Sequence, residues 1–240
     1  YMETKEKAQE KLYSNTDLRK LILPLVMEQL LAVLVGMLDT VMISGEGEAA
    51  VSGVSLVDNI NILVINIFAA LATGGAVVAG HALGQKKAEQ AGKAAWQMVL
   101  FMIYSSFVTM VLLLAAHKTI LRVTFGKVDD AVMGSATVYL LITALSICPL
   151  AIYNACAALF RAMGNSKTTM LISLLMNLIN FVGNAILIFG VGLGVAGAAI
   201  ATTVSRTVAA VLIFRLMLDE KRVIHFKNRM TWKLEGNLVK

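Results

Sequence analysis

The stretch Leu30–Ser44 reads LLAVLVGMLDTVMIS, and Asp39 is its only charged residue. It belongs to a longer apolar segment, 21–44, which as a helix is long enough to cross a bilayer core of about 30 Å. A carboxylate at that depth is costly, and membrane helices retain one mainly where it lines a pathway or meets a partner. The segment therefore predicts a membrane helix with a functional acid. The alternative is an acid that extends to the headgroups, because Asp39 lies about 9 Å from Gly45 along a helix.

Long windows without Asp, Glu, Lys or Arg recur along the rest of the chain, at 59–85, 94–117, 131–160 and 168–205. Only 15% of the residues are charged, against roughly 25% in a soluble domain. We therefore expect an all-α membrane protein with six transmembrane helices, at 21–44, 53–80, 95–116, 131–160, 168–189 and 195–218. A kink is expected at Pro149, because proline lacks the backbone N–H.

The basic residues predict the orientation of the bundle. Of 21 Lys and Arg residues, 17 lie in four segments that six spans place on one side: 1–20, 81–94, 161–167 and 215–240. The positive-inside rule assigns that side to the cytoplasm. We expect a multi-pass membrane protein with a cytoplasmic N-terminal segment (1–20), a bundle (21–218) and a cytoplasmic linker (219–240). The net charge of +6 reflects this asymmetry, and no nucleic-acid partner is expected.

A ladder of polar residues marks the predicted fifth span. Ser173, Asn177, Asn180 and Asn184 recur at helical spacing and share a stripe about 60° wide. Amide oxygens can coordinate Na⁺, and amide N–H groups can donate to a carboxylate. The ladder predicts a polar cavity that faces Asp39. The alternative is interhelical hydrogen bonding that only holds the bundle together.

Other polar residues give weaker signals. Asn59 and Asn66 share one face of the second span and are candidates for lining the cavity. Tyr139 is a candidate for a hydrogen bond within the cavity or for an aromatic belt at the membrane surface. Thr202 and Arg206 lie one turn apart on the last span, where Arg206 either pairs with an acid or extends toward the interface.

Residues 192–197, GLGVAG, match the G-x-G-x-x-G pattern of dinucleotide-binding proteins. That pattern requires a soluble βαβ unit, whereas both flanks here are apolar and of membrane length. The glycines more simply predict a tight turn and close helix packing. The sequence has no Walker A, H-E-x-x-H, G-x-S-x-G or C-x-x-C pattern, so we expect neither an enzyme nor a cofactor.

Four stretches, in this order, resemble the multidrug and toxic compound extrusion (MATE) family: LPLVMEQLLAVLVGMLDTVMIS (23–44), ALATGGAVVAGHALGQKKAEQAGKA (70–94), LFRAMGNSKTTM (159–170) and NLINFVGNAILIFGVGLGVAGAAIATTVSR (177–206). The resemblance implies a twelve-helix transporter with two six-helix lobes, of which this chain is the first lobe and the start of the linker. It implies export of cationic or amphipathic compounds in exchange for H⁺ or Na⁺, and a location in the plasma (inner) membrane. The implied partners are those compounds, the lipid bilayer and a second six-helix lobe, which is either absent from this sequence or a separate chain.

The resemblance also implies an ion-coupling site, formed by Asp39, Tyr139, Asn180, Asn184 and Thr202. Of these, Asp39, Asn180 and Thr202 are the candidate Na⁺ ligands. A position at which the family often has a second acid is Asn184 here. One negative charge is therefore missing, and the choice between H⁺ and Na⁺ stays open.

The mechanism that we expect is alternating access, in which the ion and the drug compete for one cavity. Two other functions stay open. A lipid-linked precursor flippase of related fold would need cationic residues in its cavity, and Arg206 is the one clear candidate. A non-transporting membrane scaffold subunit would use the asparagine ladder only for packing, and replacing Asp39 with Asn would then have no effect.

Overall fold

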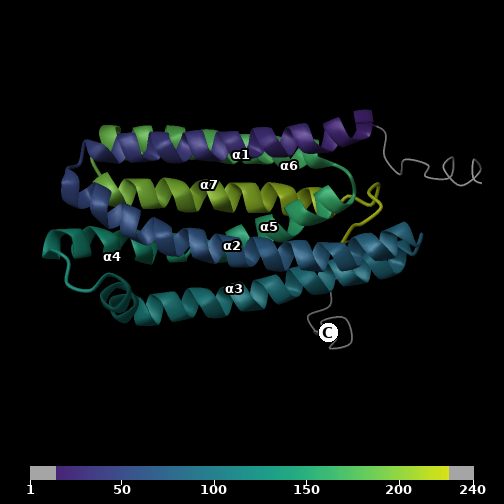
Figure 1. The fold of residues 1–240 in the computed structure, drawn as a ribbon, viewed down its shortest axis with the longest axis horizontal. Coiled ribbons are helices and arrows are strands. Elements are labelled where there is room, and N and C mark those ends of the chain that lie inside the picture. Colours follow the sequence, from purple (N-terminus) through teal and green to yellow (C-terminus); the bar gives the residue numbers. More distant parts are fainter. Residues whose placement is uncertain (1–14, 227–240) are drawn as a thin grey trace, which may run out of the picture.

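The structure, a computed structural model, describes residues 15–226, so residues 1–14 of the predicted N-terminal segment and 227–240 of the predicted linker lie outside the described residues. Every described element is helical (Figure 1). The elements are α1 (Asn15–Ser44), α2 (Glu48–Gly84), α3 (Ala88–Phe125), α4 (Asp130–Ala144), α5 (Ile147–Ala162), α6 (Ser166–Asn184), η2 (Ala185–Gly190) and α7 (Gly194–Met217). The short element η2 is a π-helical continuation of α6.

These helices form six membrane spans. Five are single helices, counting α6 with η2, and the other is the pair α4 and α5, which meet at a bend of 51°. The predicted all-α bundle of six spans is therefore confirmed. The second and third helices have 37 and 38 residues and are longer than expected. At about 1.5 Å per residue they exceed the thickness of a bilayer core, so they tilt or extend beyond it.

The kink expected at Pro149 is present. The chain breaks between α4 and α5, and Pro149 lies in the first turn of α5. A proline nitrogen cannot donate to the carbonyl four residues earlier, which here belongs to Leu145. The hydroxyl of Thr203 on α7 lies 3.1 Å from the carbonyl oxygen of Ile142, at the end of α4, and 2.9 Å from the carbonyl oxygen of Ala199 on its own helix. A neighbouring helix thus supplies a donor at the break, as a membrane interior requires.

Helix α1 packs against the bundle along one narrow stripe and lies beside α6 (Figure 1). The residues of this stripe are at least half-buried and recur every three or four positions: Leu21, Pro24, Glu28, Leu31, Val35, Asp39 and Met42. Large apolar side chains on the remaining faces of α1 are exposed, among them Leu23, Leu34, Met37 and Val41. The stripe therefore holds both acids of the membrane-spanning part of α1.

The rest of the lobe is packed closely through small residues. A core of α2, α3 and α5 contains many buried alanines, among them Ala72, Ala76, Ala79, Ala91, Ala95, Ala151 and Ala155. Gly53 of α2 lies against the backbone of α4, where a Cβ atom would come within 2.8 Å of the carbonyl oxygen of Val132. Small residues allow such close approach between membrane helices.

The glycines near 190 form a turn and a packing contact. Gly192 and Gly194 have φ of +73° and +52°, a region that favours glycine. A Cβ atom on Gly197 would come within 3.0 Å of the Leu187 carbonyl group. The interpretation of GLGVAG as a turn with close packing is confirmed.

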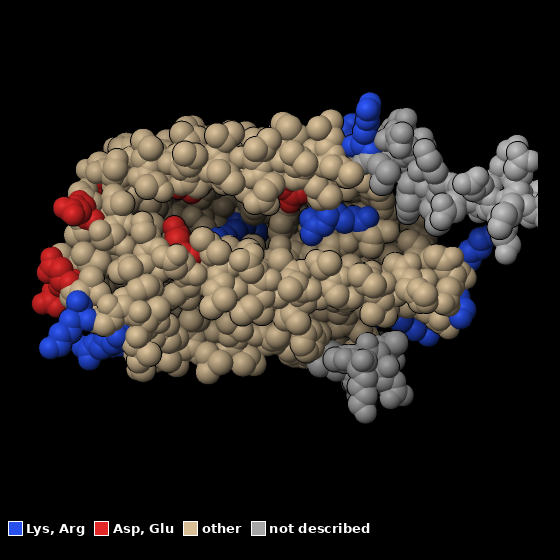
Figure 2. All heavy atoms as spheres, viewed as in Figure 1, with Lys and Arg blue, Asp and Glu red and all other residues tan. Residues whose placement is uncertain are grey.

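The two ends of the bundle differ in charge (Figure 2). We call the end with the turns at 85–87 and 163–165 the basic end, since Lys86, Lys87 and Lys167 lie there. The opposite end, with turns at 45–47, 126–129 and 191–193, has both acidic and basic residues. Figure 2 also shows a hollow on one face of the bundle, with charged side chains of both signs in and around it.

Candidate ion-binding site

Asp39 meets α6 at the point where that helix changes its winding. Asp39 is half-buried on the stripe of α1, and Asn184 Nδ2 donates to Asp39 Oδ1 at 2.7 Å. Asn184 is the last residue of α6, directly before the π-helical segment η2. Short π-helical segments occur frequently at functional sites. The local widening of the helix therefore coincides with the contact between the acid and its amide partner.

Asn180, one turn earlier on α6, also faces Asp39. With its amide nitrogen toward the acid, Asn180 donates to Asp39 Oδ1 at 3.0 Å and Oδ2 at 3.1 Å, and its oxygen accepts from Thr202 Oγ1 at 3.1 Å. In the opposite orientation the nitrogen donates to Thr202 Oγ1 at 3.1 Å, and the amide oxygen faces the carboxylate. Two acceptors this close are stable only around a proton or a cation. The first orientation therefore satisfies both polar groups of the Asn180 amide when Asp39 is ionised.

Tyr139 and Thr202 complete this part of the site from α4 and α7. Tyr139 is buried, and its hydroxyl interacts with Thr202 and with Asp58 of α2. The structure thus brings all five predicted coupling residues together, from four helices: Asp39, Tyr139, Asn180, Asn184 and Thr202.

Asp58 is a second acid that the sequence did not assign to the site. Asn61 Nδ2 lies 3.5 Å from Asp58 Oδ1, and Tyr139 contacts the same carboxyl. The predicted second span begins at residue 53, only five residues before Asp58. In the structure α2 begins at Glu48, ten residues earlier, which places Asp58 about 15 Å inside the helix.

Arg206 of α7 is the basic residue of the site. Its Nη1 donates to Ser146 Oγ, at the bend between α4 and α5, at 2.8 Å. It also interacts electrostatically with Asp39, Asp58 and Tyr139. Two acids and one guanidinium leave one net negative charge when all three are ionised, and a single bound cation would balance that charge.

The predicted cavity-lining residues separate into two groups. Ser173 and Asn177 lie on the same side of α6 as Asn180, where Ser173 is buried and Asn177 is half-buried. Asn59 and Asn66 are exposed on the outward face of α2, and Asn59 Nδ2 donates to the backbone oxygen of Ser55 on its own helix. The buried asparagine of α2 is instead Asn61, whose spacing of three residues from Asp58 was the available signal.

The ligands that this site offers are oxygen atoms. They come from two carboxylates, the amide of Asn180, and the hydroxyls of Tyr139 and Thr202. Within residues 15–226, no three His, Cys, Asp or Glu side chains cluster in a way that would hold a metal ion. The arrangement can bind a proton, or a hard monovalent cation such as Na⁺ through oxygen ligands.

Comparison with known proteins gives the family. The MatE family model matches residues 24–186. The chain belongs to the MatE family. Among its curated relatives are the uncharacterized transporter YisQ of Bacillus subtilis (strain 168), 28% identical over 204 residues, and the probable multidrug resistance protein NorM of Thermotoga maritima, 29% identical over 198 residues. These alignments cover 83% and 81% of this MatE chain but only 44% and 42% of the relatives.

Solved structures show the same fold. A MOP superfamily transporter from Pyrococcus furiosus superposes with a TM-score of 0.85 at 20% identity, over 93% of this MatE chain and 49% of that chain. An outward-facing MATE family transporter superposes with a TM-score of 0.84, also over 93% and 49%. The chain is therefore one six-helix lobe of a two-lobe, twelve-helix transporter fold, which confirms the predicted family and fold class.

Proposed function

We propose that this lobe is half of a multidrug efflux antiporter that exports cationic or amphipathic compounds in exchange for H⁺ or Na⁺. Membership of the MatE family and the relatives named as probable multidrug resistance proteins support export of drugs. The observation that most supports ion coupling is Asp39, held by Asn180 and Asn184 between α1 and α6.

In this proposal, ion binding is coupled to the conformational change through the packing of α1 on the rest of the bundle. When Asp39 is ionised, two amide N–H groups of α6 can donate to it. A proton or a Na⁺ ion on Asp39 removes the need for these donors and favours the orientation in which the Asn180 oxygen faces the acid. Because α1 packs only along its narrow stripe, a change at Asp39 changes the packing of the whole helix. The ion drives alternating access if it binds the inward-facing and outward-facing conformations with different affinity.

The drug-binding cavity lies, in this proposal, between this lobe and a second six-helix lobe. The outward face of α2 supports this placement, because it is exposed and mainly apolar and includes Ile62, Leu63, Ile67 and Leu71. Asn59 and Asn66 lie on the same exposed helix and would line the cavity. An apolar wall with a few amides suits compounds that are both apolar and hydrogen-bonding.

The orientation is also part of the proposal. The basic end faces the cytoplasm and the lobe lies in the plasma membrane, because the basic residues concentrate on one side. In this orientation Asp39 lies in the outer half of the bilayer, and Glu28 lies in the inner half.

A flippase for lipid-linked precursors is the second candidate function, since Arg206 is a cation in the interior. However, Arg206 bonds to Ser146 and is balanced by Asp39 and Asp58, so the interior has no excess positive charge for a phosphate. The scaffold function predicts that Asp39 serves only for packing.

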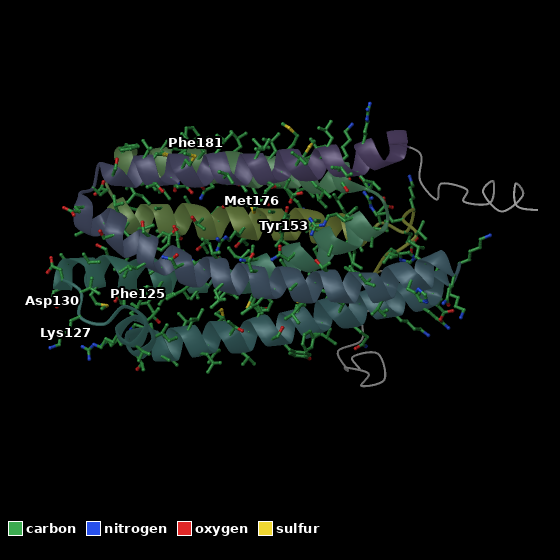
Figure 3. The ribbon with its side chains drawn as sticks, viewed as in Figure 1. Phe125, Lys127, Asp130, Tyr153, Met176 and Phe181 are labelled. Carbon is green, nitrogen blue, oxygen red and sulfur yellow. The ribbon has the colours of Figure 1, made fainter. Side chains whose placement is uncertain are left out.

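Efflux of a fluorescent cation from everted vesicles tests these functions, using the full-length protein under separate ΔpH and ΔNa⁺ gradients. We expect the wild type to transport and Asp39→Asn to lose transport while still folding and inserting. The matched control is Asp130→Asn, which makes the same chemical change at an exposed helix end (Figure 3) and should transport normally. Normal transport by Asp39→Asn would reject the coupling site, and no transport by the wild type would favour the scaffold or flippase function.

A further inference from the structure

Glu28 and Asp39 lie on the same side of α1. They are eleven residues apart, which at 100° per residue leaves them about 20° apart around the helix and about 16 Å apart along it. On α6, Ser173 and Asn184 are also eleven residues apart and frame the polar ladder. We call the contact between these two faces, from Glu28 and Ser173 to Asp39 and Asn184, the α1–α6 seam.

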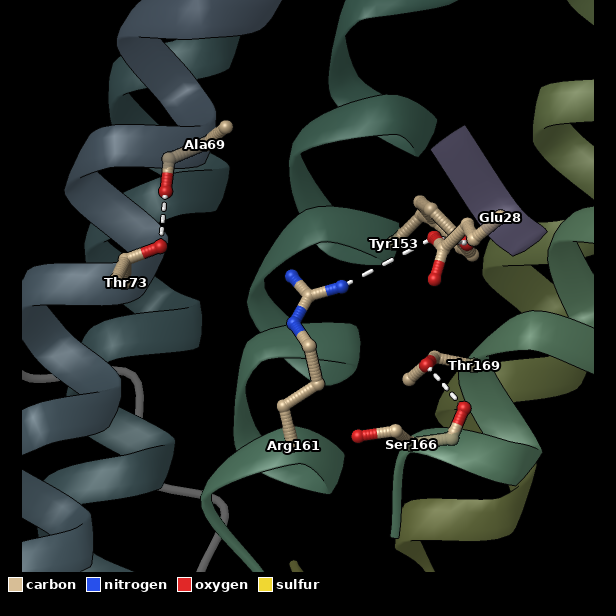
Figure 4. Close-up of polar contacts among 7 residues, drawn as sticks. All are labelled: Glu28, Ala69, Thr73, Tyr153, Arg161, Ser166 and Thr169. Carbon is tan, nitrogen blue, oxygen red and sulfur yellow. Dashed lines mark hydrogen bonds and ion pairs between the residues drawn. The ribbon is translucent and has the colours of Figure 1, made fainter. Parts of the chain in front are cut away.

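A second polar cluster forms at the Glu28 end of the seam (Figure 4). Tyr153 of α5 lies inside the bundle (Figure 3), and its hydroxyl donates to Glu28 Oε1 at 3.3 Å. The same hydroxyl interacts with Ser173 of α6. Arg161 Nη1 lies 3.9 Å from Glu28 Oε1, at the outer limit of an ion pair. Tyr153 and Arg161 are the titratable and charged groups that the described residues place against this carboxylate.

Three polar atoms along the seam are buried and have no hydrogen-bonding partner among the described residues. They are Glu28 Oε2 at one end, Asn177 Nδ2 in the middle and Asn184 Oδ1 at the other end. Buried polar atoms without a partner are rare in folded proteins, because each loses its bonds to water. Two of them are acceptors, one at each end of the seam, and the donor of Asn177 lies between these ends in the sequence of α6. Acceptors at both ends fit a path along which a cation passes between two oxygen ligands.

We propose that Glu28, Tyr153 and Ser173 form an inner binding site for the coupling cation, H⁺ or Na⁺, and that the α1–α6 seam conducts the cation between this site and Asp39. The inner site rests on the antiport function proposed above. Its ligands are the unpartnered Glu28 Oε2 and the hydroxyl oxygens of Tyr153 and Ser173. Asn177 lies between the two sites, where its amide offers both an oxygen ligand and a donor.

Arg161 neutralises Glu28 when the inner site holds no cation. A bound Na⁺ repels the guanidinium, and a proton on Glu28 removes the charge that attracts it, so either ion releases Arg161 from the carboxyl group. It has space to move away, because Arg161 also lines a cavity of about 460 Å³ between α2 and α5, together with Thr73, Gly80 and Ala158. Arg161 and the coupling cation therefore alternate as partners of the carboxylate.

The test compares binding with driven transport in the full-length protein, reconstituted in liposomes. In Glu28→Gln we expect the fluorescent cation to bind as in the wild type, and H⁺ or Na⁺ to displace it as in the wild type, because Asp39 is intact. We expect the gradient-driven efflux rate to fall at least ten-fold, because the cation no longer passes along the seam. Runs with ΔpH alone and with ΔNa⁺ alone identify the cation. The matched control is Glu48→Gln, at an exposed position in the first turn of α2, which should match the wild type.

Two results would overturn the inner site. One is a wild-type efflux rate in Glu28→Gln. The other is a loss of ligand binding and thermal stability in parallel with the loss of transport, which would make Glu28 a packing residue. If Glu28→Gln does not fold, Tyr153→Phe replaces it as the test variant. It removes one hydroxyl and should slow driven efflux several-fold with unchanged binding, and a wild-type rate would overturn the proposal.

If the wild type shows no ion-driven efflux, the antiport function fails, and the inner site with it. If the wild type and Asp39→Asn behave as expected but Glu28→Gln is normal, only the inner site fails.

Discussion

The α1–α6 seam and the core of α2, α3 and α5 are packed in opposite ways. The core is close-packed through alanines, and the buried residues of α2, α3 and α5 are apolar apart from Asn61, Gln97 and Ser106. The seam joins α1 to the bundle through a narrow stripe, with an acid at each end and buried polar atoms that have no hydrogen-bonding partner among the described residues. Close-packed interiors resist small displacements, whereas α1 exposes large apolar side chains over most of its surface and has fewer packed neighbours. The lobe thus combines a rigid frame, which we define as α2, α3 and α5 with α4 packed on it, with one helix whose attachment, in our proposal, depends on an ion.

The largest expected effect is a loss of stability caused by a substitution in the frame. Gly53→Ala should lower stability by about 2 kcal/mol, because the added Cβ would lie 2.8 Å from the backbone of Val132 and Ala136. Gly36→Ala on α1 is the matched control, since no neighbouring atom lies within 4 Å of the position that its Cβ would take. We expect this control to be neutral or slightly stabilising. Thermal unfolding of the purified full-length variants measures both, and equal stability would show that the frame is no tighter than α1.

The second-largest effect is expected from a substitution in the α1–α6 seam, and it should lower the rate of transport. Asn180→Leu removes an amide that can donate to both oxygens of Asp39, so ion-driven efflux should fall at least ten-fold, which equals about 1.4 kcal/mol. Folding should change little, because the frame is untouched. Leu178→Ala, at an exposed position of α6, serves as the control. Wild-type efflux in Asn180→Leu would show that the amide does not take part in coupling.

A smaller effect is expected when the seam gains a charge. Asn184→Asp places a second carboxylate beside Asp39, where two acids and oxygen ligands favour Na⁺. We expect the Na⁺ concentration at half-maximal efflux to fall several-fold. The measurement is the efflux rate against Na⁺ concentration at fixed pH. An unchanged Na⁺ dependence would show that residue 184 does not determine the choice of ion.

The smallest effect is expected at the bend between α4 and α5. Thr203→Val removes the hydroxyl that donates to the carbonyl of Ile142, while it keeps the shape of the side chain. Hydrogen bonds between membrane helices contribute about 0.6 kcal/mol on average. The melting temperature should therefore fall slightly and transport should persist. A loss of transport without a loss of stability would place the bend in the mechanism.

The sequence predicted the spans well because charge is excluded from the bilayer core. It misplaced helix ends because helices continue past the bilayer through charged residues. For example, α2 begins at Glu48, and α3 continues through Lys118 and Arg122. A window without charged residues indicates the membrane-spanning part of a helix. It does not indicate the residue at which the helix begins or ends.

The site was predictable where polar residues of one type repeat at helical spacing, as Asn180 and Asn184 do. It was not predictable on α2, where polar side chains point in several directions and only packing determines which are buried. Asn61 is buried, while Asn59, two positions away, is exposed. The role of Glu28 also depends on tertiary structure, because its partner Tyr153 is 125 residues away in the sequence.

Ion release on substrate binding tests most directly the claim that Asp39 binds the coupling ion. A cationic substrate is added to the purified full-length protein in weakly buffered solution, with a pH indicator in one run and a Na⁺ indicator in another. We predict that the wild type releases about one ion per bound substrate and that Asp39→Asn binds substrate but releases none. Equal release by both proteins would contradict the account, because the ion would then bind at a site that does not include Asp39.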